Sequence, residues 1–340
     1  MARIWGAGSN IQTAAPASPT VALGTNRWYK SNDGSAQYDP VWPIAVAPVA
    51  IESSEIVTDG AFLYVIGCLD TVEMGKRGVF RYSPAANTWT RMTPLPAAAQ
   101  GAAVWIIGGV IYSFSGYNGS AVTPAFYAYD LAGGTAGAWV NLAVAAAVNV
   151  CYRASAAVAG GKAVIVGGFN AGFSPQNQTR IFDPTQPEGS RWSVGTAHPI
   201  SITEAPTWGY GGLAYLAGGW NGSAQSAVRT YDPATGVWAT LASDPLPSGR
   251  YRVNNGALVG TKVYLFGGLT TGASATLANN RMDLVASAGS RWSGQLANVP
   301  GSVSSLQHHG SVGLGGIVYS TADGVHLFAY VPSEGANRPY

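Results

Sequence analysis

A unit of about 50 residues recurs along the chain, and it constrains the fold more than any other feature. Each copy contains a β-rich run that ends at a residue pair holding glycine, then an aromatic or apolar residue before a turn, then a tryptophan. The pairs are Gly67-Cys68, Ser115-Gly116, Gly167-Gly168, Gly218-Gly219 and Gly267-Gly268. The residues before the turn are Tyr82, Tyr129, Phe182, Tyr231 and Met282, and the tryptophans are Trp89, Trp139, Trp192, Trp238 and Trp292. Three series that keep the same register indicate repeated structural units.

Each unit predicts four short antiparallel strands. The glycine pair permits a tight turn without a side chain, an Asp-Pro pair favours the next turn, and the tryptophan is large enough to fill the space between neighbouring sheets. Composition agrees, because 10% of residues are charged and the chain has 45 glycines and 20 prolines, against about 25% charged residues in ordinary soluble domains. A four-stranded sheet cannot bury both faces alone, so the units must pack against one another.

The glycine pair, the Tyr-Asp turn and the tryptophan at this period resemble the kelch repeat, over residues 51–340. The resemblance implies an all-β, six-bladed β-propeller with four-stranded antiparallel blades. The first, second and sixth copies depart from the pattern at the glycine pair. The expected blades are about 51–98, 99–147, 148–199, 200–247, 248–302 and 303–340, the last with a strand near 26–48, so that 26–340 is one propeller.

An N-terminal strand is expected to complete the sixth blade, because the last unit supplies only three strands before the chain ends. Closure by such a strand removes an exposed sheet edge. Trp42 and Trp28 are the candidates. Trp42 is favoured because it lies about one repeat before Trp89, whereas Trp28 follows an arginine, as Trp292 does. Residues 1–25 show no strand or helix period, and they are either a flexible tail or an arm that docks on a partner.

A polar ring is expected where the innermost strands begin, about fourteen residues before each glycine pair. Its members are Ser53, Gln100, Arg153, Glu204, Arg252 and His308. Two interpretations stay open at this point. The ring binds a ligand, or its opposite charges form an ion-pair network around the axis.

The loops after the glycine pairs carry an aromatic residue beside an asparagine. They are Tyr117-Asn118-Gly119, Phe169-Asn170-Ala171-Gly172 and Trp220-Asn221-Gly222. Aromatic rings cover the apolar faces of sugars or peptides, and amides bond to their polar groups. Tyr117, Phe169 and Trp220 are therefore candidate ligand-binding residues, although Asn-Gly is also ordinary turn chemistry.

Several function classes are disfavoured. The net charge is +2 without a Lys/Arg cluster, so nucleic acid and anionic membranes are not expected partners. Cys68 and Cys151 form neither a disulfide framework nor a metal-spacing pattern. The copper site of kelch-related oxidases needs His and Tyr ligands and a Cys-Tyr link, and this constellation is not found, so no cofactor or metal is expected. Residues 1–15 lack the apolar run of a secretory signal, and the compartment stays undetermined.

We therefore expect a non-catalytic binding or structural propeller that contacts a protein or a glycan with one loop face. The alternative is a sugar mutarotase or epimerase resembling the kelch-type sialic-acid mutarotase, in which Arg153, Glu204, Arg252 and His308 would supply acid and base groups. Low charge and abundant Gly and Ala resemble phage virion components such as tail or receptor-binding proteins.

Overall fold

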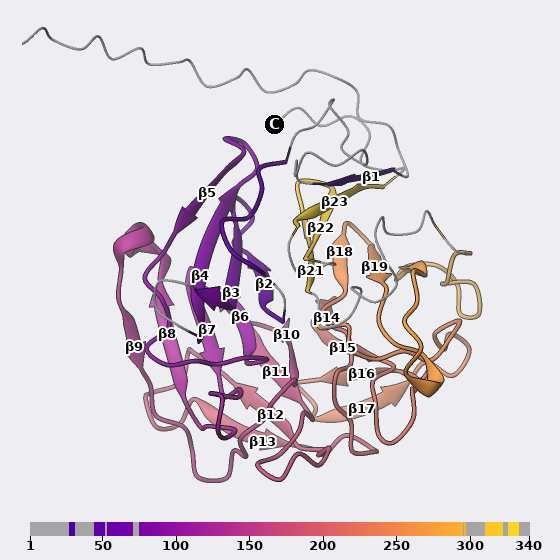
Figure 1. Cartoon of the computed structure of the whole chain (residues 1–340). Helices are drawn as coiled ribbons and strands as arrows, with labels where there is room; N and C mark the ends of the chain where they lie inside the picture. Colours follow the sequence, from indigo (N-terminus) through magenta and orange to yellow (C-terminus); the bar gives the residue numbers. More distant parts are fainter. Residues whose placement is uncertain are drawn as a thin grey trace, which may run out of the picture.

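The computed structural model describes residues 27–30, 44–51, 53–70, 75–294, 296, 310–321 and 326–332. These residues form six small antiparallel sheets arranged as a ring (Figure 1). Five sheets have four strands, and the sheet of the fifth blade has three. The all-β, six-bladed propeller predicted from the repeat is confirmed. Among the described residues, no helix is long and apolar enough to cross a bilayer.

The strands follow one another from the axis outward in each blade, as the repeat predicts. Blades 1 and 2 comprise β2 (Glu55–Thr58), β3 (Leu63–Asp70), β4 (Gly75–Ser83), β5 (Thr88–Arg91), β6 (Ala103–Ile107), β7 (Val110–Phe114), β8 (Phe126–Asp130) and β9 (Trp139–Asn141). Blades 3 and 4 comprise β10 (Ser155–Ala159), β11 (Lys162–Val166), β12 (Thr179–Phe182), β13 (Trp192–Gly195), β14 (Thr207–Tyr210), β15 (Leu213–Ala217), β16 (Val228–Asp232) and β17 (Val237–Thr240). Blades 5 and 6 comprise β18 (Ala257–Val259), β19 (Lys262–Phe266), β20 (Asn279–Asp283), β21 (Ser311–Leu314), β22 (Ile317–Ser320), β23 (Phe328–Val331) and β1 (Arg27–Lys30). Two short 3-10 helices, Leu131–Ala136 and Thr271–Ala273, lie in loops.

The sixth blade is completed by β1, which pairs antiparallel with β23 in the order β1-β23-β22-β21. Trp28 lies opposite Tyr330 in this pairing. Closure by an N-terminal strand is confirmed, but the strand is the one around Trp28 and not the one around Trp42 that the repeat spacing favoured. Trp42 itself lies outside the described residues. The spacing misled because the segment just after Trp42 is also part of the repeat. It corresponds to the linker that joins the outer strand of one blade to the next blade, since the Ala45 carbonyl accepts from Trp89 as the Thr93 carbonyl does from Trp139.

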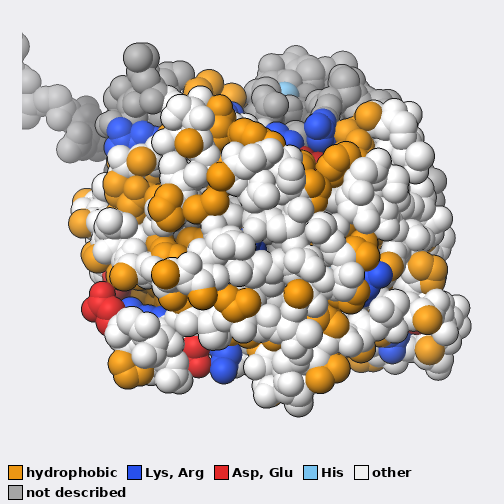
Figure 2. All heavy atoms as spheres, turned by 90° about the horizontal axis from the view of Figure 1, so that it is seen from below, with side chains coloured by type: hydrophobic (Ala, Val, Ile, Leu, Met, Phe, Trp, Pro, Cys, Tyr) orange, Lys and Arg blue, Asp and Glu red, His pale blue; other side chains and the backbone are white. Residues whose placement is uncertain are grey.

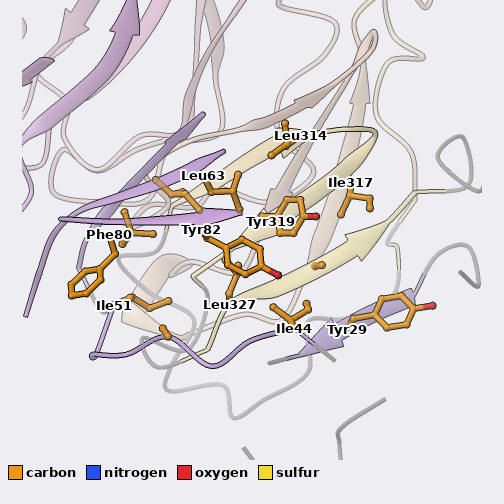
Figure 3. Packing of buried hydrophobic residues seen from close by; sticks show 14 of the residues in the cluster. Tyr29, Ile44, Ile51, Leu63, Phe80, Tyr82, Leu314, Ile317, Tyr319 and Leu327 are labelled. Carbon is orange, nitrogen blue, oxygen red and sulfur yellow. The ribbon is translucent and has the colours of Figure 1, made fainter. Parts of the chain in front are cut away.

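The apolar core is divided into six clusters, each lying between two neighbouring blades. The cluster that joins blades 6 and 1 contains Tyr29 of the closing strand together with Ile44, Tyr82 and Tyr319 (Figure 3). Its members are almost fully buried, with Tyr29 2% exposed and Ile44 0%. Burying a side chain of this size contributes roughly 1.5–3 kcal/mol. The core therefore depends on closure of the ring.

The aromatic and tryptophan series of the repeat lie opposite each other in the outer two strands. Tyr82 faces Trp89, with ring centroids 5.0 Å apart, and Tyr231 faces Trp238 at the same distance. Tyr129 and Phe182 face Trp139 and Trp192 in the same way. In blade 5, the described residues at this place form a bridge between Met282 and Trp292, and the N–H groups of Ser293 and Leu296 donate to the carbonyls of Arg281 and Asn279, both at 2.8 Å.

Most of these tryptophans also tie their blade to the preceding one. The indole Nε1–H groups of Trp89, Trp139, Trp238 and Trp292 donate to the carbonyls of Ala45, Thr93, Thr196 and Asp244, at 2.9, 2.9, 3.0 and 3.0 Å. Each acceptor lies in the linker that precedes the blade. Trp192 departs from this rule, because its Nε1 is buried without a hydrogen-bond partner.

The glycine pairs are required by close backbone approach as well as by turn geometry. Gly167 has a φ of 64°, and a Cβ there would lie 2.1 Å from the Ile202 carbonyl oxygen in the next linker. Only glycine fits such a position. The pair thus fixes how closely adjacent blades pack.

Candidate ligand-binding face

The polar ring is built on a backbone conformation that recurs in consecutive blades. Ser53, Gly101, Arg153, Glu204 and Arg252 have φ angles of 56, 60, 56, 55 and 61°. This left-handed conformation costs an L-residue roughly 1–2 kcal/mol. It lets the Arg153 N–H donate to the Gly101 carbonyl at 2.8 Å, the Glu204 N–H to Arg153 at 3.1 Å and the Arg252 N–H to Glu204 at 3.0 Å. A chain of backbone hydrogen bonds therefore links equivalent positions of neighbouring blades.

In the second blade, the equivalent ring position is Gly101, one residue after Gln100. Gln100 forms a bridge with Tyr117, as Tyr152 does with Phe169 and Thr203 with Trp220. Its counterparts are therefore the residues that precede Arg153 and Glu204. Counting fourteen residues back from Ser115 gives Gly101, as the same count gives Arg153 and Glu204 in the next two blades, whereas Gln100 lies one residue further back. His308 lies outside the described residues.

Arg153, Glu204 and Arg252 meet in one charged cluster. Arg153 Nη1 lies 2.5 Å from Glu204 Oε1, and Arg252 Nε lies 3.5 Å from the same oxygen. The Glu204 side chain is 4% exposed, against 18% for Arg153 and 33% for Arg252. The axial ion-pair network, one of the two interpretations of the sequence, is present. Two guanidiniums thus share one buried carboxylate.

Such a cluster stands out on a surface that has few charged groups. Charged residues make up 10% of the chain. The side of the molecule seen from below, next to the outer strands of blades 3 and 4, shows a few blue and red side chains scattered among uncharged and apolar ones (Figure 2). Tyrosines support both arginines. The Arg153 guanidinium lies 4.8 Å from the centroid of Tyr152, and that of Arg252 lies 5.8 Å from the centroid of Tyr251. Cation–π contacts of this kind help to fix the orientation of an arginine.

Aromatic side chains from three loops and from the linker before β10 form a belt beside this cluster, defined by Tyr117, Tyr152, Phe169, Phe173 and Trp220. Ring centroids are 5.8 Å apart for Tyr117 and Tyr152, 6.1 Å for Tyr152 and Phe169, and 6.2 Å for Phe169 and Trp220. The three aromatic residues singled out in the sequence are thus brought together, with Tyr152 as the link between Tyr117 and Phe169.

Phe173 is the member of the belt that the sequence did not reveal. It is 50% exposed, has a φ of 57°, and packs 5.7 Å from Tyr117 and 6.1 Å from Tyr152, measured between ring centroids. A bulky residue with a positive φ is a conformational outlier, and such outliers cluster at functional sites. The sequence aligns Gly172-Phe173-Ser174 with Gly272-Ala273-Ser274 of blade 5, and Ala273 has the same conformation, with a φ of 59°.

The asparagines of the loops are engaged in turn formation. Asn118 Oδ1 accepts from the backbone N–H groups of Ser120 and Ala121, at 2.9 and 2.8 Å. Asn170 Oδ1 accepts from Gly172 and Ser174, at 2.9 and 3.0 Å. The oxygen atoms of both side-chain amides therefore stabilise turns, as expected for ordinary Asn-Gly turn chemistry.

Beside the Asn170 loop lies a cavity of about 360 Å³, lined by Asn149, Val150, Asn170, Ala171, Gly172 and Gln176.

Glu55 is a second buried carboxyl group that sequence reasoning missed. It starts the innermost strand of blade 1, is 7% exposed, and accepts a hydrogen bond from Asn254 Nδ2 at 2.8 Å. Loss of hydration on burial raises the pKa of Glu55 to about 8.

Below the ring, the innermost strands line an axial cavity of about 350 Å³ that is bordered by Ile56, Trp105, Trp208 and Val312.

In the described part of the chain, no three His, Cys, Asp or Glu residues come close enough together to hold a metal ion. Both cysteines are buried, and no disulfide joins them. Burial raises the pKa of the Cys151 thiol. A buried, protonated thiol is a poor nucleophile.

Comparison with known proteins adds the family. Among curated proteins, a Kelch domain-containing protein of Sulfurisphaera tokodaii is 27% identical over 141 residues, which are 39% of this chain and 18% of that protein. Kelch-like protein 15 of Danio rerio is 26% identical over 250 residues, 65% of this chain and 39% of that protein. The chain thus spans less than half the length of these relatives.

Among solved structures, the one titled "Structure of YjhT" superposes with a TM-score of 0.65 at 16% identity, over 84% of this chain and 95% of that one. At this identity the likeness shows the fold alone. The model of the KLHDC2/KLHL20/DRC7 Kelch-repeats domain matches residues 53–268, more than half of the chain. The repeat, the ring of blades and this match lead to one conclusion: the chain belongs to the Kelch-repeats family.

Proposed function

We propose that the chain is a non-catalytic binding propeller, and that its loop face over blades 2 to 4 contacts a protein or a glycan. The observation that carries this proposal is Phe173, an exposed aromatic side chain held with a positive φ beside Tyr117 and Tyr152. Exposing a phenyl ring in a strained loop lowers the stability of the free chain. A partner that covers the ring would compensate for that loss.

The neighbouring groups suit a partner with both apolar and polar surface. The aromatic belt offers ring faces, while Arg153 and Arg252 present partly exposed guanidiniums held in place by Glu204. Guanidiniums donate well to carboxylate and hydroxyl oxygens. Aromatic and arginine side chains are also the usual dominant contributors to protein interfaces.

The geometry favours binding over mutarotase chemistry. Glu204 is buried between two guanidiniums and engaged by both. An exchange of sugar anomers needs a group that can take up and release a proton at the substrate. Here, the carboxylate is better placed to orient the two arginines than to act on a substrate.

The test is a screen of the full chain on a glycan array and against a displayed peptide library, followed by affinity measurement for the best ligand. The Phe173→Ala variant should bind at least about 30-fold more weakly, the loss of roughly 2 kcal/mol typical of a dominant contact. The loop should keep its shape, because Ala273 holds the same conformation in blade 5. The control is Val237→Ala, since Val237 is 58% exposed on the outer strand of blade 4. Equal affinity of the parent and Phe173→Ala would refute the proposal.

We also propose, from the low charge and the abundant Gly and Ala of the sequence, that the chain is a component of a larger particle such as a phage virion. If residues 1–25 dock the chain in a larger particle, a chain lacking them should remain folded but should not incorporate. Normal incorporation would argue against a docking arm.

A further inference from the structure

The loops that precede Trp192 in blade 3 and Trp292 in blade 5 have the same hydrogen-bond pattern. The Asp183 N–H donates to the Arg191 carbonyl at 2.8 Å, as Asp283 does to Arg291. Arg191 Nε donates to the Gln186 carbonyl at 3.2 Å, and Arg291 Nε donates to the Ala286 carbonyl at the same distance. The two loops therefore provide an internal comparison.

In blade 5, the carboxylate of Asp244 from the preceding linker occupies this loop. Asp244 Oδ1 accepts from the backbone N–H groups of Gly289 and Arg291, at 3.0 and 3.2 Å. The other carboxylate oxygen of Asp244 lies 3.9 Å from Arg291 Nε. The main-chain carbonyl of Asp244 accepts from Trp292 Nε1 at 3.0 Å. The Asp244 side chain is 3% exposed. The loop is thus a carboxylate-binding cradle.

In blade 3, the linker that would supply the carboxylate carries alanine. The linkers align without a gap from Leu142 to Arg153 and from Leu241 to Arg252, which places Ala145 opposite Asp244. The first hydrogen bonds agree, since the N–H groups of Leu142 and Leu241 both donate to the carbonyl at the start of the third strand of their blade, at 2.8 and 2.9 Å.

A cavity of about 130 Å³ lies at this place, between blades 2 and 3. It is lined by Phe126, Leu142, Val144, Phe182, Glu188 and Trp192, and also by Ala145, Gly189 and Arg191. Trp192 is 8% exposed, and its Nε1 has no hydrogen-bond partner. A buried donor without an acceptor is costly. Cavities of about 150 Å³ with apolar walls bind molecules the size of benzene.

We propose that this cavity binds a small monocarboxylic acid with an apolar body. Its carboxylate takes the position of the Asp244 carboxylate in blade 5 and accepts from the Gly189 and Arg191 amides. Its second oxygen accepts from Trp192 Nε1, whose counterpart Trp292 is bound in blade 5 by the main-chain carbonyl of Asp244. The body of the acid lies among Phe126, Leu142, Val144 and Phe182. Glu188 and Arg191 both line the cavity, so its wall carries one negative and one positive side chain.

The test uses benzoate, with benzamide as the neutral isostere, in calorimetric titrations of the full chain. Benzoate should bind at one site per chain, and benzamide at least about 10-fold more weakly, because a charge-assisted hydrogen bond exceeds a neutral one. Ala145→Asp should abolish benzoate binding and raise the Tm without ligand, since the aspartate fills the cradle. No saturable binding of benzoate, or unchanged binding by Ala145→Asp, would overturn the proposal.

A converse variant keeps the proposal testable if Ala145→Asp does not fold. Asp244→Ala should lower the Tm, add a second benzoate site and recover part of its Tm when benzoate is present. A capped peptide carrying an aspartate side chain distinguishes the source of the carboxylate. Binding of that peptide without binding of benzoate would contradict the assignment to a free acid.

Discussion

Glu55 places a carboxyl group at the start of the innermost strand of blade 1, where burial raises its pKa from 4.5 to about 8. The folded chain therefore holds a proton that the unfolded chain releases, and the free energy of unfolding should fall as pH rises from about 4.5 to about 8. The slope contributed by this group is at most about 1.4 kcal/mol per pH unit. Glu55→Gln should remove that slope and stabilise the chain above pH 7.

Urea unfolding of the parent and Glu55→Gln from pH 5 to pH 9 measures this difference. Subtracting the two curves separates Glu55 from His198, whose pKa burial lowers to about 4. His198 acts with the opposite sign, because its stabilisation is present above pH 6.5 and is lost as pH falls through 4. Parallel curves for the two chains would show that the Glu55 carboxyl is ionised in the folded state at neutral pH.

At the scale of single residues, the sequence predicts which charged side chains share the polar ring better than it predicts the side chains that surround a given residue. Arg153, Glu204 and Arg252 were placed on one ring by counting along the repeat, and the structure brings them together. Phe173 could not be found this way, because the equivalent residue of blade 5 is Ala273, which shares the positive φ but has no aromatic ring. Glu55 was missed because its partner, Asn254, is about four repeats away along the chain.

Among the elements, the outer strands test whether the indole hydrogen bonds between blades stabilise the ring. Trp139→Phe removes the donor to the Thr93 carbonyl and should lower the free energy of unfolding by about 1–2 kcal/mol. Trp192→Phe is the matched control, because its Nε1 has no acceptor to lose. Denaturant unfolding without added carboxylate compares the two. Equal losses would mean that ring volume, and not the hydrogen bond, accounts for the effect.

The strands themselves were largely predictable, since the glycine pair, the Tyr-Trp facing pairs and the inter-blade packing all follow from the repeat. The identity of the closing strand was not, because the segments around Trp28 and Trp42 both resemble repeat elements. The spacing of the repeat identifies segments that belong to the repeat, but it does not tell a linker from a strand. Pairing with β23 decides the matter, and it involves Arg27–Lys30.

For the whole molecule, closure links the two ends of the chain and brings six blades to one axis. β1 pairs with β23, and Tyr29 packs into the core between blades 6 and 1 (Figures 1 and 3). Without β1, the sixth blade would expose an edge strand and lose part of this core. The hydrogen bonds between ring positions link blades 2 to 5 in series, from Gly101 through Arg153 and Glu204 to Arg252.

The most direct test of this account compares two truncations, one lacking residues 1–25 and the other lacking residues 1–31, by thermal unfolding. The first should keep the Tm of the full chain, since β1 begins at Arg27. The second should lose roughly 5–10 °C, as expected when a few kcal/mol are removed from a large domain. Equal Tm values for the two truncations would contradict a ring closed by the N-terminal strand.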